Sequence, residues 1–297
     1  MMLNVNTFKW RYRTFCSKIN GGEPWMSWAE AAKVCLRISY LKHFLPSTIK
    51  IDVLKEEGDF LLIRMPDGCE LFYPKDQLLE HLEMVYRERS EISPVVVKPG
   101  DYVIQVGAAE GYFARSVQEK AGKIYLVEPL SYWRQCLRKT FRSSLGGIEI
   151  LPYALGGKEK KEVPFYVPKN WFAGSSISYD WAKSQCNNKE MLEVKVHMKP
   201  LDLIVSQENM KKVDFIKADI EGSELAMLKG AYETLRRFKP KLSIEVYHKP
   251  DDIPFMLDIL KKLGYKIRLY NFNCHVYKEE PPFCSPQMLL AYHQRHN

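Results

Sequence analysis

The sequence of 297 residues lacks the marks of several protein classes. Its seven cysteines are odd in number, scattered, and never spaced as Cys-x-x-Cys, which argues against a disulfide framework or a zinc knuckle. No run approaches the roughly 18 apolar residues of a transmembrane helix, and the first residues contain no apolar core long enough for a signal peptide. We therefore expect reduced thiols, no transmembrane segment and a cytoplasmic location.

The charge is moderately one-sided, with 44 Lys and Arg against 36 Asp and Glu, a formal net charge of +8. Such an excess suits an anionic substrate, an acidic membrane surface or a nucleic acid. However, the chain has no run of Lys and Arg with interleaved aromatics of the kind that RNA-binding proteins carry. A nucleic-acid partner is not predicted, and a plain basic soluble protein explains the charge equally well. Nothing indicates an oligomeric state.

Residues 1–94 are predicted to form a small N-terminal α+β region. Residues 24–45 place apolar side chains at helical spacing and suggest a helical cap. Residues 48–74 alternate with period two, and the Asp67-Gly68 pair predicts a hairpin with a two-residue turn. Residues 75–91 read as a helix, and prolines 94 and 99 mark a boundary.

Residues 95–278 alternate between buried strands and helices, which predicts an α/β domain. Alternation of this kind builds a mostly parallel sheet, here of seven strands, with helices on both faces and right-handed crossovers. Residues 157–200 interrupt the pattern and read as an inserted hairpin or lid. Residues 279–297 are predicted to be a C-terminal tail.

Ligands of such sheets bind beyond the carboxyl ends of the strands, where the strand order reverses. The first strand is followed by GAAEG (107–111), which lacks the G-x-G-x-x-G order of a pyrophosphate site. Glu128 follows the second strand about 20 residues after Gly107, the spacing of a carboxylate that binds a ribose. Together they predict a nucleoside ligand without pyrophosphate, such as S-adenosylmethionine. Taken singly, each also fits a tight turn or a strand end with no ligand.

The segments VIQVGAAEGYFA, LVEP and VDFIKADIEGSELAMLKGA resemble the motifs of the FkbM-type methyltransferases, within the Rossmann-like class I enzymes that use S-adenosylmethionine. The resemblance covers about residues 95–275, and the DIEGSE block is its most specific part. One position departs from the pattern: the family usually has Asp before the Val-Gly of the first strand, where this chain has Gln105. An amide can make the same hydrogen bond without the charge.

The resemblance implies a set of residues around S-adenosylmethionine. The loop would wrap the methionine part, Glu128 would hold the ribose, and Tyr153 and Ala154 would line the adenine slot, although plain strand packing explains those two as well. Asp219 would lie between the cofactor and the acceptor. The implied cofactor-binding residues are Gln105, Gly107, Ala108, Glu110, Gly111, Tyr112, Glu128, Tyr153, Ala154 and Asp219.

The implied reaction is displacement of a methyl group from a sulfonium by an oxygen nucleophile, in which alignment of the reactants is the main contribution of the protein. A neutral hydroxyl would need a general base, and Asp219, Glu245 and His248 are the candidate catalytic residues. Glu221 is a further candidate, but Glu221 and Glu224 also fit an acidic helix start. Asp219, Glu245 and His248 also suit a divalent cation such as Mg²⁺, and His248 also fits a structural role.

We therefore expect an O-methyltransferase that acts on a hydroxyl of a small molecule: a sugar, a glycolipid or a secondary metabolite. A nucleic-acid methyltransferase is the enzymatic alternative, although base methylation favours D-P-P-Y or N-P-P-Y where this chain has D-I-E-G (219–222). A non-catalytic binding module with the same fold also fits. The acceptor is expected under the insertion, against an aromatic wall or, equally, lid packing: Trp171, Phe172, Tyr179 and Trp181.

Overall fold

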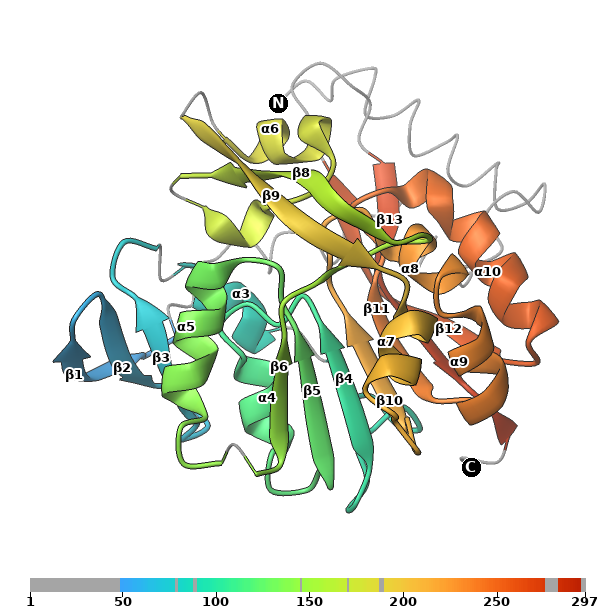
Figure 1. Cartoon of the computed structure of the whole chain (residues 1–297), viewed down its shortest axis with the longest axis horizontal. Helices are drawn as coiled ribbons and strands as arrows, with labels where there is room; N and C mark the ends of the chain where they lie inside the picture. The colour runs from blue at the N-terminus through green and yellow to red at the C-terminus, as the bar shows by residue number, and fades with distance from the viewer. Residues whose placement is uncertain are drawn as a thin grey trace, which may run out of the picture.

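The computed structural model describes residues 49–77, 80–87, 90–144, 146–169, 171–186, 190–275 and 283–294 (Figure 1), so the helix predicted for residues 24–45 lies outside the described residues. The N-terminal part is an antiparallel meander of β1 (Asp52–Glu57), β2 (Phe60–Arg64) and β3 (Glu70–Pro74), followed by α3 (Glu80–Arg87). The meander agrees with the period-two pattern.

The two-residue turn of this meander is not at Asp67-Gly68, where we predicted it. It joins β1 to β2, because Glu57 pairs with Phe60 and Gly58, at φ 63°, takes the first turn position. The Asp67-Gly68 pair lies in a longer loop, residues 65–69, between β2 and β3. A glycine at positive φ is common to both turns, so the dipeptide alone does not fix the loop length.

A seven-stranded sheet forms the centre of the molecule, in the order β12-β13-β11-β10-β4-β5-β6. All of its strands are parallel except β13, which runs antiparallel to both β11 and β12. This confirms the predicted mostly parallel sheet. The strands are β4 (Tyr102–Val106), β5 (Lys123–Val127), β6 (Ile148–Leu151), β10 (Phe215–Ala218), β11 (Lys241–Glu245), β12 (Lys266–His275) and β13 (Phe283–Tyr292).

Helices cover both faces of the sheet because consecutive strand residues point to opposite sides. Val103 belongs to the core under α4 and α5, whereas its neighbour Ile104 belongs to the core under the other helices. The helices are α4 (Tyr112–Val117) and α5 (Ser131–Thr140) on one face, and α7 (Leu201–Gln207), α8 (Glu224–Lys229), α9 (Tyr232–Phe238) and α10 (Ile253–Lys262) on the other.

The insertion is a second, three-stranded sheet at one end of the first (Figure 1). Short β7 (Ala154–Leu155) pairs with β9 (Met191–Lys199), which pairs antiparallel with β8 (Lys160–Pro168). Between β8 and β9 lie the 3-10 turn η2 (Phe172–Gly174) and α6 (Tyr179–Gln185). The predicted inserted hairpin is therefore present, and we call residues 157–200 the lid.

The predicted tail is wrong for residues 283–292. They form β13, which lies between β11 and β12, so the domain extends at least to Tyr292. The prolines at 281, 282 and 286 weaken the strand signal of this segment. Its place is set instead by tertiary pairing, in which the fully buried Leu289 lies opposite Ile244 and Leu269.

A buried ion pair at the far end of the sheet generates a stability prediction. Lys241 Nζ donates to Asp101 Oδ2 at 2.6 Å, and the two side chains are only 1% and 11% exposed. We expect Asp101→Asn to lower the free energy of unfolding by about 3–5 kcal/mol, because it leaves a buried ammonium without its counter-charge. Urea unfolding measures this. The double variant Asp101→Asn/Lys241→Met should recover part of the loss, and an additive loss would contradict the pairing.

Candidate active site

Two cavities meet at the carboxyl ends of β4, β5 and β10. The first encloses about 1090 Å³, counting its open mouth, and runs from β5 and β7 past β10 to the lid. The second encloses about 730 Å³ and lies over the loop after β4. Five residues line both: His81, Val85, Gly107, Ala109 and Asp219. The two cavities therefore adjoin at the point where the strand order reverses, the place expected for a ligand site in an open parallel sheet.

The loop after β4 depends on glycine at its first position. Gly107 has φ 70°, and a Cβ there would lie 1.8 Å from the carbonyl oxygen of Asp219. The β4 loop and the end of β10 are thus in backbone contact. Ala109 takes φ 43° without being glycine, a conformation that costs energy and is often found at functional sites. Its N–H donates to Glu128 Oε2 at 3.0 Å, which ties the loop to the end of β5.

Gln105, the residue that departs from the family pattern, makes hydrogen bonds to the same loop and to the helix that follows it. Its Oε1 accepts a hydrogen bond from Ala114 N at 3.1 Å, and its Nε2 donates to Ala108 O at 3.5 Å. The side chain is buried and lines the second cavity. The amide therefore bonds to a donor of α4 and an acceptor of the loop, a task that a carboxylate, which only accepts, cannot perform in full.

Glu128 and the residues after β6 form the far end of the first cavity. Glu128 is buried, and its carboxylate accepts hydrogen bonds from the backbone N–H groups of Ala109 and Leu130. Burial raises its pKa to about 7, although these two hydrogen bonds act in the opposite direction. Tyr153 and Ala154 line the same end of the cavity. The structure thus brings together the residues predicted for a ribose and an adenine.

Two further residues of the predicted set, Glu110 and Tyr112, face the N-terminal region, and Ala108 lines the second cavity. The hydroxyl of Tyr112 donates to Asp67 Oδ2 at 2.7 Å, and the residue borders the second cavity. Glu110 is buried; its Oε1 accepts from Tyr112 N, and its Oε2 lies 3.7 Å from His81 Nε2. The meander and α3 therefore support the loop directly.

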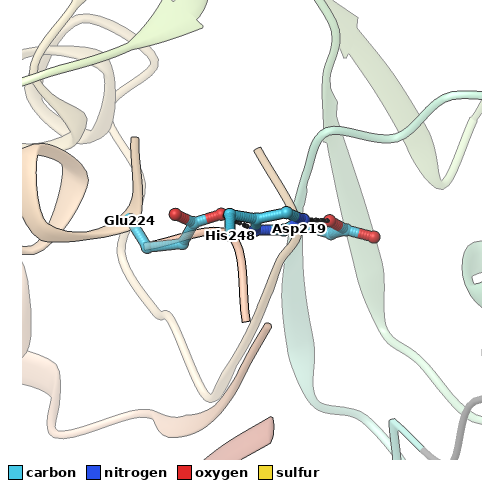
Figure 2. Close-up of side chains that lie close together, drawn as sticks. All are labelled: Asp219, Glu224 and His248. Atoms are coloured by element: carbon cyan, nitrogen blue, oxygen red, sulfur yellow. Dashed lines mark hydrogen bonds and ion pairs between the residues drawn. The ribbon is translucent and has the colours of Figure 1, made fainter. Parts of the chain in front are cut away.

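The turn after β10 concentrates carboxylates around one histidine (Figure 2). Glu224 Oε1 accepts from the N–H groups of Ile220 and Gly222 and lies 2.9 Å from His248 Nδ1. On the other side of the ring, His248 Nε2 lies 3.5 Å from Asp219 Oδ1 and 3.3 Å from Glu221 Oε2. The imidazole therefore bridges carboxylates through both of its nitrogens.

This arrangement favours a charged imidazole. Burial acts to lower the pKa of His248, but Glu221, Glu224 and Asp219 outweigh it and raise the pKa to about 10. Burial likewise opposes ionisation of Asp219, yet the charges of Lys217 and His248 hold the pKa of Asp219 below its ordinary value. For Glu221, burial dominates and raises the pKa. At neutral pH Asp219 is therefore ionised, whereas Glu221 retains its proton more strongly.

The cluster fits an ion-pair network better than the predicted cation site. Donor atoms of Asp219, Glu224 and His248 lie within 4.8 Å of one another. His248 Nδ1 already faces Glu224 Oε1 at 2.9 Å, so in this arrangement the two side chains pair with each other. Glu245, the third residue of the predicted set, is buried at the end of β11 and lines neither cavity.

Several residues of the site escaped the sequence analysis, and two of them, His81 and Lys217, carry basic side chains. His81, on α3, lines both cavities and lies 3.2 Å from the hydroxyl of Tyr73 through its Nδ1; no motif marks it. Lys217 lines the second cavity. A signal for Lys217 existed, because a strand residue two positions before Asp219 points to the same face of the sheet. Of the predicted aromatic wall, Trp171, Phe172 and Trp181 line the first cavity.

The strand order, the loop after β4 and the carboxylates after β5 and β10 define a Rossmann-like fold of the class I methyltransferase type. The family described as "Methyltransferase FkbM domain" matches residues 105–267. The chain therefore belongs to the FkbM methyltransferase family. Among the described residues, no helix has the length and apolar character needed to cross a membrane.

Solved structures with similar folds include an FkbM methyltransferase from Methylobacillus flagellatus, with 23% identity and a TM-score of 0.44 over 65% of this chain and 44% of that one. The chain thus matches less than half of that protein. TYW2 of M. jannaschii in complex with AdoMet shares 11% identity with a TM-score of 0.40, over 82% of this chain and 90% of that one. An rRNA methylase from Streptococcus thermophilus shares 16% identity with a TM-score of 0.37, over 67% of this chain and 90% of that one. A comparison with curated proteins found no match.

The His248 network predicts a pH-dependent stability. A histidine whose pKa rises from 6.5 to about 10 on folding stabilises the fold fully below pH 6.5 and loses that contribution as the pH rises to 10. The free energy of unfolding of the wild type should therefore fall between pH 7 and 9.5, by up to about 1.4 kcal/mol per pH unit. The slope should be smaller for His248→Gln, as urea titrations at each pH will show. His197→Gln, at a half-buried histidine that pairs only with the exposed Glu159 among the described carboxylates, should retain the wild-type slope. Equal slopes in all three proteins would contradict the network.

Proposed function

We propose that the protein is an S-adenosylmethionine-dependent methyltransferase that methylates a hydroxyl group of a small molecule, such as a sugar, a glycolipid or a secondary metabolite. One observation supports this above the others. A single cavity joins the end predicted for adenosine, with Glu128 and Tyr153, to the lid aromatics, and it passes the carboxylate of Asp219 on the way. A donor at one end and an acceptor at the other would meet at Asp219.

The carboxylates of the site favour a nucleoside that carries positive charge as the ligand. Glu128, Glu110 and Asp219 all border the cavities and are buried or nearly so. Carboxylates in these positions would repel the pyrophosphate of a dinucleotide, whereas the sulfonium and ammonium groups of S-adenosylmethionine would be attracted. The Gly107 backbone lies against Asp219, which leaves no room for a side chain beneath the ligand.

When bound, S-adenosylmethionine supplies a methyl group on a sulfonium, whose methyl carbon an oxygen nucleophile would attack in line with S-adenosylhomocysteine as the leaving group. The residues of this chain would supply alignment, the major part of catalysis in such a reaction. Asp219 and Glu221 both line the first cavity next to the lid. As the C–O bond forms and the C–S bond breaks, the hydroxyl proton would pass to one of these carboxylates. Glu221 in its ionised form is the stronger base, because its pKa is raised.

His248 and Glu224 would act through these carboxylates rather than on the acceptor. His248 lines neither cavity, and its ring lies behind Asp219 and Glu221. Its charge would keep Asp219 ionised and fix the orientation of both carboxylates. We therefore propose His248 as a positioning residue rather than the general base. We propose no catalytic role for Glu245.

The aromatic side chains of the lid favour a small, flat or ring-shaped molecule as the acceptor. Trp171, Phe172 and Trp181 line the cavity mouth with Tyr247, and such rings stack on sugars and other rings. Tyr179 is 45% exposed and lies outside the lining, so it does not belong to this wall. Ser176 Oγ donates to the carbonyl oxygen of Glu221 at 2.7 Å, which fastens the lid to the acidic turn.

Ligand-induced stabilisation tests the cofactor. S-adenosylhomocysteine at roughly 100 times its dissociation constant should add about 2.7 kcal/mol to the stability of the protein and raise its melting temperature, and NAD at the same excess should not. Glu128→Ala and Asp219→Ala should fold but show a smaller shift with S-adenosylhomocysteine. A shift with NAD alone, or wild-type shifts in both variants, would contradict the site.

The raised pKa of Glu128 predicts pH-dependent binding. Ribose hydroxyls donate to a carboxylate, so binding favours the ionised form and should release protons below a pH of about 7. The affinity for S-adenosylhomocysteine, measured by calorimetry, should therefore rise as the pH increases from 5.5 to 7.5 and then level off. Glu128→Gln, which cannot ionise, should bind more weakly and lose this rise. A rise of wild-type size in Glu128→Gln would assign the titration to another group.

A further inference from the structure

One face of α3 borders the first cavity and carries an exposed apolar side chain. Met84 and Val85 follow His81 by three and four positions, which places them on the same face of the helix, and all three line this cavity. Met84 is 48% exposed. Among the exposed large apolar side chains in the described part of the chain, it alone lines either cavity. A side chain that lines a cavity and remains in contact with solvent lies at the opening of that cavity.

The lid meets α3 at this opening and adds further apolar side chains. The rings of His81 and Trp171 are 5.8 Å apart, so the helix and the lid are in contact. The apolar side chains that α3 and the lid present to the first cavity here, which we call the apolar wall, are Met84, Val85, Trp171, Phe172 and Ile177. An apolar surface of this kind gains free energy when a ligand covers it and removes it from water.

The lid offers few polar groups to an acceptor with many hydroxyls. Besides the indole of Trp181, it contributes two polar side chains to the first cavity, and each donates a hydrogen bond within the lid. Ser175 Oγ donates to the carbonyl oxygen of Phe172 at 2.7 Å, and Gln185 Nε2 donates to Ser184 Oγ at 2.9 Å. Burial of a hydroxyl without a hydrogen-bond partner costs free energy. The lid therefore favours an acceptor with much apolar surface over a free sugar.

The charged residues of the first cavity disfavour an anionic acceptor. Glu128, Asp219 and Glu221 line this cavity, whereas no Lys or Arg of the described residues does. A phosphate or a carboxylate on the acceptor would meet the negative charge of these side chains without a cation to balance it. Phosphorylated sugars and nucleotides are therefore disfavoured, and an uncharged acceptor is expected.

We propose that the acceptor is an uncharged amphiphile, with a ring whose hydroxyl faces Asp219 and Glu221 and an apolar chain that leaves the cavity over Met84. This inference rests on the proposed function and narrows its acceptor to a hydroxyl compound that carries an alkyl chain. Met84 is then a specificity-determining residue, because it contacts the chain and not the reacting hydroxyl. A glycolipid and an alkylated phenol share this chemistry, and the experiment separates them.

Calorimetric titration of the protein saturated with S-adenosylhomocysteine tests the proposal with two matched pairs of ligands below their micelle concentrations. One pair is methyl and octyl glucoside, and the other is para-cresol and para-pentylphenol. In at least one pair the longer chain should bind about tenfold tighter or more, because burial of two methylene groups suffices for that gain. Met84→Gln should reduce this advantage about three- to tenfold and leave the short ligand unchanged. Phe255→Gln, on α10 at a 62% exposed side chain that lines neither cavity, should retain the full advantage.

The outcomes of this experiment separate the proposal from the proposed function. An advantage of the longer chain in the glucoside pair alone supports a glycolipid, and one in the phenol pair alone supports an alkylated phenol. Equal binding within both pairs, no binding of any of the four ligands, or an unchanged advantage in Met84→Gln would overturn the proposal. Tighter binding of a phosphorylated glucose than of methyl glucoside would also overturn it. Failure of the wild type to bind S-adenosylhomocysteine would overturn the proposed function itself.

Discussion

The close approach of Gly107 to Asp219 is the constraint on which the site depends. The two residues end neighbouring parallel strands, and the N–H of Asp219 donates to Val106 O, so the backbones meet where a Cβ at position 107 would lie 1.8 Å from an oxygen. This contact brings the loop after β4, which reaches Glu128, against the turn that carries the carboxylates. The Glu128 end of the site and its acidic turn are therefore built on one junction between two strands.

Charge compensation explains why so many ionisable groups can be buried at this junction. Isolated, each of Asp219, Glu224 and His248 would lose much free energy on leaving water. Together they form a chain in which Glu224 also accepts two backbone N–H groups and Lys217 faces Asp219 from the next cavity. The charges of the network hold Asp219 ionised and His248 protonated, so exchanging either of these two residues alters the pKa of the other. That coupling, rather than a single residue, sets the electrostatics of the site.

The sequence patterns predicted most of the fold and the elements common to the family. They failed for residues whose place depends on contacts with segments distant in the sequence. Period and glycine spacing located the β4 loop and Glu128 because these are local signals. The strand β13 was missed because its prolines read as loop and its pairing partners are distant in sequence. His81 was missed for the same reason, since only the docking of α3 brings it to the cavities. Glu245 was chosen because it ends a strand, but its side chain lines neither cavity.

The residues that line the two cavities come from two parts of the chain. The walls at the carboxyl ends of β4, β5 and β10 lie within the part of the chain that matches the family. His81 and Val85 belong to α3, before that match begins, and close both cavities. Gln77, from the loop before α3, accepts a hydrogen bond from the N–H of Phe172 and so joins the N-terminal region to the lid. A change in either segment would reshape these cavity walls while leaving the Gly107–Asp219 junction intact.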